Sequence, residues 1–178
     1  GSNKILNLMN RKHTIDEYLD IFDKLKKINS KIEFSSDFII GYPGENDQDF
    51  SETLELIKKI KFINSYSFIY SPRPGTIAAN LETIDQKIST DRLKKVQSQL
   101  FENQISMNKA LENSTLSVLV ENLTEDKKRV FGRSEYMTSV IFNGRKSDIG
   151  KIVNVKIEKS NRNTLFGKII NNSNQKVA

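Results

Sequence analysis

Two turns that combine proline with glycine are the strongest candidates for a ligand site in this sequence. Residues 41–44 (GYPG) end the apolar run DFII, residues 72–75 (PRPG) end the run SYSFIYS, and together they hold all three prolines of the chain. Glycine lets a ligand approach the backbone closely, and proline fixes the chain beforehand. Arg73, held between two prolines, would be a preorganised cation for phosphate or carboxylate. The alternative is that both are ordinary turns after strands, with an exposed arginine.

Asp37 and Glu45 place carboxylates on either side of the first turn. In a strand, Asp37 shares one face with Ile39 and Gly41, because side chains alternate with a period of two. A carboxylate on an apolar strand is costly to bury without a partner, so Asp37 is a candidate for binding a hydroxyl or an amine. The alternative is a strand edge that water reaches. His13, the one histidine, lies beside an expected helix start and is interpreted as a surface residue.

Other kinds of site are excluded or left without support by the composition. The sequence shows no nucleophile–base pair and no metal cluster, and it has no cysteine, which excludes disulfides, thiolate zinc sites and iron–sulfur ligation within these 178 residues. No apolar run approaches the roughly 18 residues of a membrane span, and no signal-peptide pattern opens the chain. The lack of a signal favours the cytoplasm.

The elements that must position the two turns alternate between helix and strand. Apolar residues at helical spacing, and a capping-box pattern at Thr14 and Glu17, predict the first helix. The expected order is helix 14–29, strand 31–40, helix 47–61, strand 65–71 and, after a loop at 72–87, helix 88–112. Short links between such elements predict parallel strands with crossover helices, an α/β fold. Because ligands bind at the carboxyl ends of parallel strands, both turns should meet at the ligand edge.

The last third of the chain differs from the rest in its sequence pattern and in its charge. Short alternating runs (LSVLVE, KRVFGR, SVIFNG, KIVNVKIE and LFGKII) separated by turn signals predict five strands in a small closed antiparallel barrel of the OB-like kind. Residues 1–114 carry 16 Lys+Arg and 16 Asp+Glu, whereas residues 115–178 carry 12 and 6, so the whole net charge of +6 lies here. Such asymmetry indicates either a footprint for a polyanion, with nucleic acid as the first candidate, or a merely solvated basic surface.

The expected domains are residues 1–113, residues 114–172 and a frayed tail at 173–178. Two strands and three helices cannot form a sheet covered on both faces, and barrels of α/β units usually need about 250 residues. We therefore expect residues 1–113 to be the back part of a larger α/β domain. Exposed edges of a truncated parallel sheet would favour dimerisation or strand exchange of such a fragment.

Three ordered motifs give the chain a resemblance to a known family. The stretches GSNKILNLMNRKHT, FSSDFIIGYPGENDQDFSETLELI and SYSFIYSPRPGTIAA are similar to the later half of radical-SAM tRNA methylthiotransferases, most closely the MiaB type. The basic stretches LVENLTEDKKRVFGRSEYMTSVIFNG and IGKIVNVKIEKSNRNTLFGKII resemble that family's TRAM module, a small RNA-binding β-barrel. The resemblance implies the C-terminal half of a TIM-like radical-SAM barrel followed by TRAM.

The resemblance implies an enzyme that adds sulfur and a methyl group to C2 of N6-isopentenyladenosine beside the tRNA anticodon. Family members use S-adenosylmethionine and two [4Fe–4S] clusters, and the cluster cysteines, three of them in a CxxxCxxC motif, precede the matched region. Because this chain has no cysteine, we expect a fragment that is inactive without the upstream half of its polypeptide. A tRNA anticodon stem-loop would be its partner, and no membrane is implied.

The resemblance also assigns roles to residues. Ser2 matches the end of a QSGS turn near the cofactor, although Gly1-Ser2 could equally be an expression scar, and Arg11 matches an arginine that would reach the cofactor carboxylate. Asp37, Gly41 and Glu45 fall on the motif that lines the cofactor pocket. Arg73 would face the entering adenosine. The expected phosphate contacts of the module are Lys128, Arg129, Arg133, Arg145 and Lys151, and its candidate stacking residues are Phe131 and Phe142.

Two other classes of function stay open at this point. The chain could come from a methylthiotransferase that acts on threonylcarbamoyl-adenosine tRNA or on a ribosomal protein, since these share the strand-end turn. It could also be a non-enzymatic RNA-binding protein whose basic barrel is the whole function. A pure binding module would have no need of the GYPGE and SPRPGT turns, so the motifs favour the enzyme.

Overall fold

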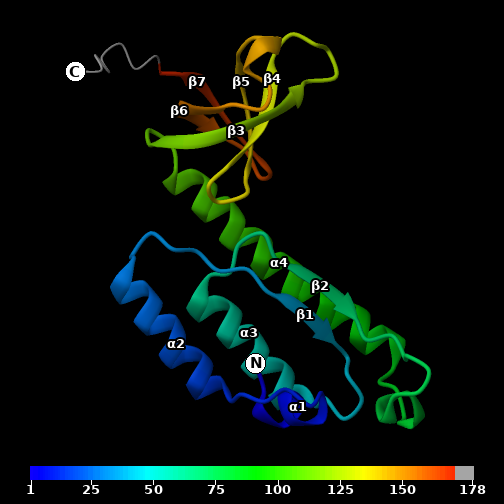
Figure 1. Ribbon diagram of the computed structural model, residues 1–178. Helices are drawn as coiled ribbons and strands as arrows, with labels where there is room; N and C mark the ends of the chain where they lie inside the picture. The colour runs from blue at the N-terminus through cyan, green and yellow to red at the C-terminus, as the bar shows by residue number, and fades with distance from the viewer. Residues whose placement is uncertain (171–178) are drawn as a thin grey trace. The chain divides into compact units, whose positions relative to one another are not determined.

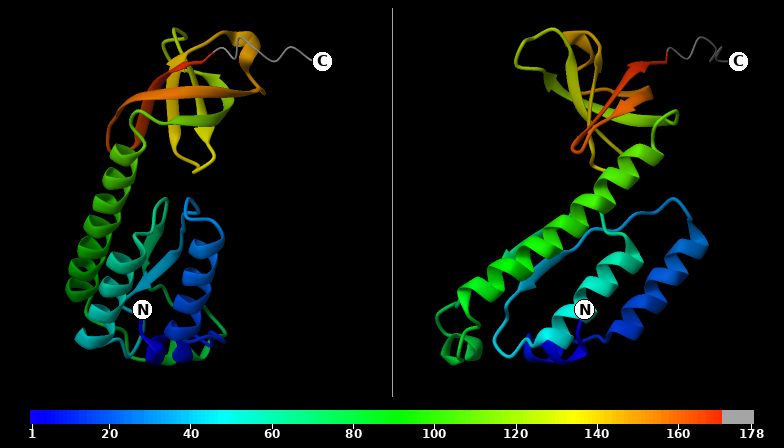
Figure 2. Two further views of the ribbon diagram at one scale, coloured as in Figure 1. Left: turned by 90° about the vertical axis from the view of Figure 1, so that its left-hand side faces the viewer. Right: turned by 180° about the vertical axis from the view of Figure 1, so that it is seen from behind.

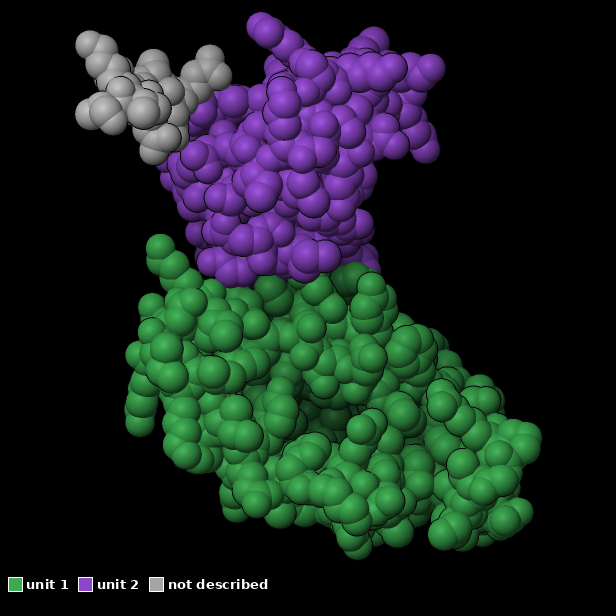
Figure 3. Space-filling view, in the orientation of Figure 1, with its two compact units in different colours: residues 1–103 green, residues 104–178 purple. Residues whose placement is uncertain are grey.

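A computed structural model describes residues 1–170 of the 178-residue chain. The chain divides into two compact units, residues 1–103 and the residues from Gln104 onward, which are coloured separately in Figure 3 and are described one at a time. The predicted frayed tail at 173–178 lies outside the described residues.

The first unit has helices packed on one face of a small parallel sheet (Figures 1 and 2). Strands β1 and β2 pair in parallel, as the sequence predicted, with Ile39 opposite Phe68. The elements are α1 (Asn3–Leu8), α2 (Ile15–Ile28), β1 (Asp37–Ile40), α3 (Asp47–Ile60), β2 (Tyr66–Ile69), a 3-10 helix (Ile77–Asn80) and α4 (Gln86–Ala110). Phe38 and Ile40 of β1 pack against α2, α3 and α4 and form the core.

Helix α2 begins where the sequence predicted capping. Thr14 accepts from the backbone N–H of Glu17 while the Glu17 carboxylate accepts from that of Thr14, so the capping box of α2 is confirmed. Asn46 and Asp49 form a second capping box at α3. Each box satisfies backbone N–H groups that the first helical turn leaves without partners.

Two elements differ from the sequence prediction. Strand β1 begins at Asp37 and not at residue 31, because the segment opposite residues 31–36 is a turn in which Lys61 and Asn64 have positive φ and cannot continue a ladder. The short helix α1 was not predicted. Its N-cap is Ser2, whose hydroxyl accepts a hydrogen bond from the N–H of Ile5, and its six residues are too few to show helical periodicity.

The second face of the β1–β2 sheet is open to solvent. The side chains on this face belong to Asp37 and Ile39 of β1 and to Tyr66 and Phe68 of β2, and Tyr66 and Phe68 are 66% and 53% exposed. Their rings lie nearly parallel, with centroids 6.5 Å apart. An aromatic face of this size is unusual on a finished surface. That residues 1–113 are part of a larger domain stays a prediction, and such a domain would cover a face of this kind.

The second unit is a closed barrel of five strands, as predicted. The strands are β3 (Thr115–Leu123), β4 (Val130–Ser134), β5 (Ser139–Asn143), β6 (Ile152–Ser160) and β7 (Thr164–Ile169), in the spatial order β3-β4-β5-β7-β6. All pairs are antiparallel except β5 with β7, which is parallel. Inward residues such as Val118, Val140 and Leu165 are fully buried. The apolar residues that alternate along the sequence of each strand are therefore the ones that fill the interior of the barrel.

Gly132 is a point at which the barrel tolerates no side chain. A Cβ atom at this position would lie 2.2 Å from the carbonyl oxygen of Leu119 on the neighbouring strand. We predict that Gly132→Ala lowers the free energy of unfolding by about 1–3 kcal/mol, the usual cost of overpacking. Urea unfolding followed by circular dichroism measures this, with the exposed Ser147→Ala as control. Equal stability of the Gly132→Ala variant and the unmodified chain would contradict the prediction.

Candidate functional site

The GYPG turn is closed by the glutamate that follows it. The N–H of Gly41 donates to both carboxylate oxygens of Glu45, at 3.2 and 3.3 Å, and the N–H of Glu45 donates to the carbonyl of Tyr42. Gly41 and Gly44 have φ of +72° and +87°, in the left-handed region where a side chain is strained. A Cβ atom on Gly41 would also lie 2.5 Å from the hydroxyl of Ser89. The turn therefore needs glycine for both its backbone and its packing.

A buried arginine from α4 holds this turn in place. The guanidinium of Arg92 donates to the Glu45 carboxylate at 2.8 Å and to Asp47 at 2.7 Å, and it lies 5.4 Å from the ring centroid of Phe50. The side chains of Arg92 and Glu45 are 8% and 3% exposed. Burial raises the pKa of Glu45, and the Gly41 N–H and the Arg92 charge oppose that rise. Glu45 thus has internal partners, so its part in this site is to shape the turn.

Sequence reasoning missed Arg92. It lies on the same side of α4 as Val96 and Leu100, which are buried at helical spacing. A charged residue at helical spacing from two apolar residues could have predicted a buried ion pair here, because a charge on a buried helix face needs a partner.

Ser2 also has an internal partner. Its hydroxyl donates to Asp49 at 2.7 Å, and the ammonium of Lys4 reaches the other oxygen of that carboxylate at the same distance. Burial would raise the pKa of Asp49, but the hydrogen bonds from Asn46, Lys4 and Ser2 together lower it. Ser2 is buried, and this network ties α1 to the first turn of α3.

The two proline turns leave the sheet at the same edge, as predicted from the parallel strands. The N–H of Tyr70 donates to the carbonyl of Ile40 at 2.8 Å, and the rings of Tyr42 and Tyr70 pack edge to face with centroids 5.0 Å apart. Arg73 is exposed beyond this contact, and its carbonyl accepts from the hydroxyl and the N–H of Thr76. No side chain of residues 1–170 pairs with the Arg73 guanidinium, which leaves the cation available to a ligand.

The predicted cofactor residues do not form one cluster. Gly41 and Glu45 follow the end of β1, whereas Asp37 is its first residue, about 13 Å away at the usual rise of a strand. Asp37 is exposed on the open aromatic face. Arg11 is exposed after α1, where its N–H donates to the carbonyl of Leu6. Asp37 and Arg11 are thus accessible, in contrast to Ser2 and Glu45.

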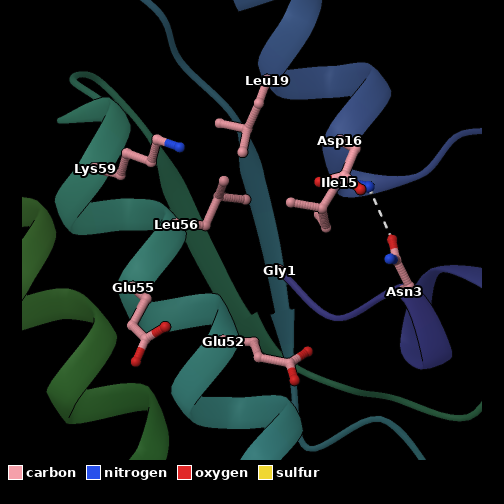
Figure 4. Close-up of a pocket in the computed structure, with 9 residues that line it drawn as sticks. All are labelled: Gly1, Asn3, Ile15, Asp16, Leu19, Glu52, Glu55, Leu56 and Lys59. Carbon is pink, nitrogen blue, oxygen red and sulfur yellow. Dashed lines mark hydrogen bonds between the residues drawn. The ribbon is translucent and has the colours of Figure 1, made fainter.

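A pocket of about 340 Å³ lies between α2 and α3 (Figure 4). Its apolar lining comes from Ile15, Leu19 and Leu56, and its charged lining from Asp16, Glu52, Glu55 and Lys59. The only hydrogen bond drawn there runs from the Ile15 N–H to Asn3 at 2.8 Å. The pocket contains none of the predicted site residues, and its acidic lining is unfavourable for a carboxylate or a phosphate.

The basic residues predicted in the barrel differ in how freely they can bind. Lys128 and Arg129 are exposed on the loop between β3 and β4, and Arg145 is exposed after β5. Lys151 is exposed and lies 3.9 Å from Asp148. Arg133 donates to Ser139 and to the carbonyl of Met137, so part of its donor set is already used.

Of the two candidate stacking residues, one lies in the core. Phe142 is 1% exposed inside the barrel, so it is unable to receive a base without unfolding the unit. Phe131 is half-buried on the outer side of β4. Side chains alternate between the two faces of a strand, and Phe131 occupies an outward position of β4 whereas Phe142 occupies an inward position of β5.

No helix within residues 1–170 is long and apolar enough to cross a membrane. In the same part of the chain, no group of three or more His, Cys, Asp or Glu side chains could hold a metal ion.

Comparisons with known proteins match both units. Residues 1–57 match the Radical SAM superfamily, and residues 109–170 match the TRAM domain. The chain is 66% identical over 178 residues to the tRNA-2-methylthio-N(6)-dimethylallyladenosine synthase of Pelagibacter ubique (strain HTCC1062), covering 100% of this chain and 40% of the relative. Relatives of the same name from Ruthia magnifica subsp. Calyptogena magnifica and Rickettsia akari (strain Hartford) are 46% and 44% identical, covering 96% of this chain and 38% and 39% of theirs.

The resemblance drawn from the sequence motifs is therefore confirmed, and so is the fold class of a partial radical-SAM domain followed by a barrel. The chain spans about two-fifths of the length of the curated relatives it matches.

The Asp49 network predicts a specific pH dependence. The pKa of Asp49 is lowered in the folded chain, so its ionised form stabilises the fold above the ordinary carboxyl pKa, and this contribution is lost as the pH falls below about 4. We predict that Asp49→Asn lowers the free energy of unfolding at neutral pH by about 1–2 kcal/mol. The loss relative to the unmodified chain should shrink in acid.

Urea unfolding at a series of pH values measures both effects. Asp23→Asn, which changes an exposed aspartate of α2, is the control and should leave the curve unchanged. A stability loss for Asp49→Asn that is the same at every pH would contradict the role given to the ionised carboxylate.

Proposed function

We propose that this chain, which belongs to the radical SAM tRNA methylthiotransferase family, is one part of such an enzyme. It would form one wall of the cofactor site and bind the RNA. The full reaction would methylthiolate C2 of N6-dimethylallyladenosine (the isopentenyl group) beside the anticodon. The observation that carries the proposal is the similarity along the whole chain, with a radical-SAM segment and a TRAM barrel in that order. Because the proposed substrate is tRNA, we propose that the enzyme acts in the cytoplasm.

The open sheet face fits the cofactor that the family uses. S-adenosylmethionine carries an amine, a carboxylate, ribose hydroxyls and an adenine ring. The exposed carboxylate of Asp37 suits the hydroxyls or the amine, and the aromatic face beside it suits the adenine. Arg11, exposed on a separate segment after α1, suits the carboxylate. When bound to a reduced [4Fe–4S] cluster, this cofactor supplies a radical. The chain has no cysteine, so segments outside it would hold the two clusters.

Glu45 and Ser2 take part in this proposal as residues that position the backbone. The Arg92–Glu45 pair holds the turn at the ligand edge, and the Ser2–Asp49 bond holds the start of α1. The part of the open face that does not meet the cofactor would be covered by the upstream part of the polypeptide. In the isolated chain, the same face would favour self-association.

The RNA partner we propose is the anticodon stem-loop of tRNA. Lys128, Arg129, Arg145 and Lys151 present exposed cations suited to phosphate, and the Arg73 turn lies at the ligand edge where the modified adenosine would enter.

The experiment that tests this proposal is a titration of the chain with a labelled anticodon stem-loop that carries dimethylallyladenosine. We predict binding that weakens about tenfold or more when the salt concentration is raised fourfold, as expected for at least two phosphate contacts. The double variant Lys128→Gln/Arg129→Gln should lower the slope of log affinity against log salt by about 2. Arg73→Gln should reduce the preference for the modified loop and leave the salt slope almost unchanged.

An unmodified stem-loop and an unrelated hairpin serve as RNA controls, and Lys24→Gln, on an exposed helix of the first unit, serves as the protein control. Equal affinity for every RNA, or an affinity that does not depend on salt, would contradict the proposed recognition.

A further inference from the structure

An apolar pocket of about 470 Å³ lies beside the GYPG turn, at the ligand edge of the first unit. We call it the edge pocket. Its lining comes from three segments: Leu8 at the end of α1, Pro43 and Gly44 of the GYPG turn, and residues 81–84, which precede α4. Sites for small molecules usually have volumes of about 300–1,000 Å³ and a mainly apolar lining, so the edge pocket is large enough to hold a ligand group.

Contacts that need no ligand hold the walls of the edge pocket in place. The Tyr42 hydroxyl donates to the carbonyl of Leu8 at 3.1 Å, and the Lys4 ammonium donates to the carbonyl of Gly44 at 2.7 Å. The 3-10 helix that precedes the third segment places Ala78 in one buried cluster with Tyr42. The three walls are therefore arranged before a ligand arrives, which lowers the entropy cost of binding.

The chemistry of the lining selects an uncharged apolar group. Leu8 and Leu81 are 45% and 44% exposed, so both offer apolar surface to a ligand. Pro43 and Ile84 add further apolar lining. Among the described residues that line the edge pocket, Glu82 carries the only charge, and a carboxylate repels an anionic ligand.

The proposed substrate carries one group that matches this lining. The dimethylallyl substituent on N6 of the adenosine is a branched hydrocarbon with neither a charge nor a hydrogen-bonding atom. We propose that the edge pocket binds this substituent and thereby makes the first unit selective for the modified adenosine. The inference rests on the proposed function and adds the residues that recognise the substrate.

The position of the edge pocket agrees with the proposed entry of the adenosine. The GYPG turn forms one wall. The chain also runs from the PRPG turn through the 3-10 helix (Ile77–Asn80) into the wall at residues 81–84, so both proline turns lead to the pocket. Arg73, exposed on that stretch of chain, offers a cation to the RNA backbone.

The edge pocket also separates two substrates that the sequence motifs left open. A threonylcarbamoyl group on N6 carries a carboxylate and several hydrogen-bonding atoms. The side chains of Leu8 and Leu81 offer it no hydrogen bond, and Glu82 repels its carboxylate. Burying a charge or an unpaired polar group in apolar surroundings is costly, so we expect the pocket to reject threonylcarbamoyl-adenosine.

The experiment titrates the chain, labelled at its methyl groups, with free nucleosides while methyl NMR spectra are recorded. The probes are N6-dimethylallyladenosine, adenosine and N6-threonylcarbamoyladenosine. The first should shift the methyl signals of Leu8, Leu81 and Ile84 at concentrations about tenfold or more below those needed for the other two. The double variant Leu8→Ser/Leu81→Ser removes apolar lining and should weaken binding of dimethylallyladenosine by about tenfold or more. Glu82→Gln should strengthen binding of the threonylcarbamoyl nucleoside alone.

Ile77→Ser is the matched control, since Ile77 is an apolar residue of the 3-10 helix that is 86% exposed and does not line the edge pocket. Thermal melting by circular dichroism establishes that each variant folds. The proposal is overturned if dimethylallyladenosine leaves the pocket methyl signals of the unmodified chain unchanged, or if adenosine shifts them equally. Equal binding of dimethylallyladenosine by the folded double variant would overturn it as well.

The anticodon stem-loop, titrated into the same protein, distinguishes failure of this inference from failure of the proposed function. Salt-dependent binding of the stem-loop without any nucleoside shift at the edge pocket would overturn the inference and leave the proposed RNA binding in place. That result would assign the apolar lining to contact with the upstream part of the polypeptide. Nucleoside shifts at the edge pocket without binding of the stem-loop would support the inference and contradict the proposed RNA binding.

Discussion

The ion pair between Arg92 and Glu45 is the interaction on which the first unit depends. Both side chains are almost fully buried, and the Glu45 carboxylate also accepts from the N–H of Gly41. Breaking a buried pair by removing one partner typically costs about 3–5 kcal/mol, because the other charge is left without compensation. The pair links three segments that are distant in sequence: the end of β1, the start of α3 and the first half of α4.

The consequence of that link is a ligand edge whose shape is set before any ligand arrives. The GYPG turn has no freedom at Gly41, where both the positive φ and the nearby Ser89 exclude a side chain. The PRPG turn is limited by its two prolines, and Tyr42 packs on Tyr70 where the turns leave the sheet. Arg11 and Arg73 are left exposed, and Asp37 is exposed at the opposite end of β1, so the accessible polar groups are few and lie on a rigid frame. The barrel is divided in a similar way, with a mostly apolar interior and exposed cations outside.

Much of this architecture could be predicted from sequence, because local signals and burial agreed. Helical periodicity with a capping box located α2, and strict alternation located the barrel strands. The motifs also indicated the two families that residues 1–57 and 109–170 match. The start of β1 was not predicted, because it depends on a turn thirty residues away. The pairing of Arg92 with Glu45 joins residues 47 positions apart and leaves only a weak signal, a charge on an apolar helix face. Phe142 was predicted as a stacking candidate but lies in the barrel core, because sequence alternation alone does not fix which face of a strand points inward.

Hydrogen–deuterium exchange of the full chain, compared between the unmodified protein and Arg92→Met, tests the central claim most directly. The account predicts that amides of residues 41–46, beginning with the Gly41 N–H that Glu45 accepts, exchange faster in the variant. Amides of the barrel strands should be unchanged. Lys95→Met, an exposed change on the same helix, is the matched control. Unaltered protection of residues 41–46 in the folded Arg92→Met variant would show that the buried ion pair does not hold the turn.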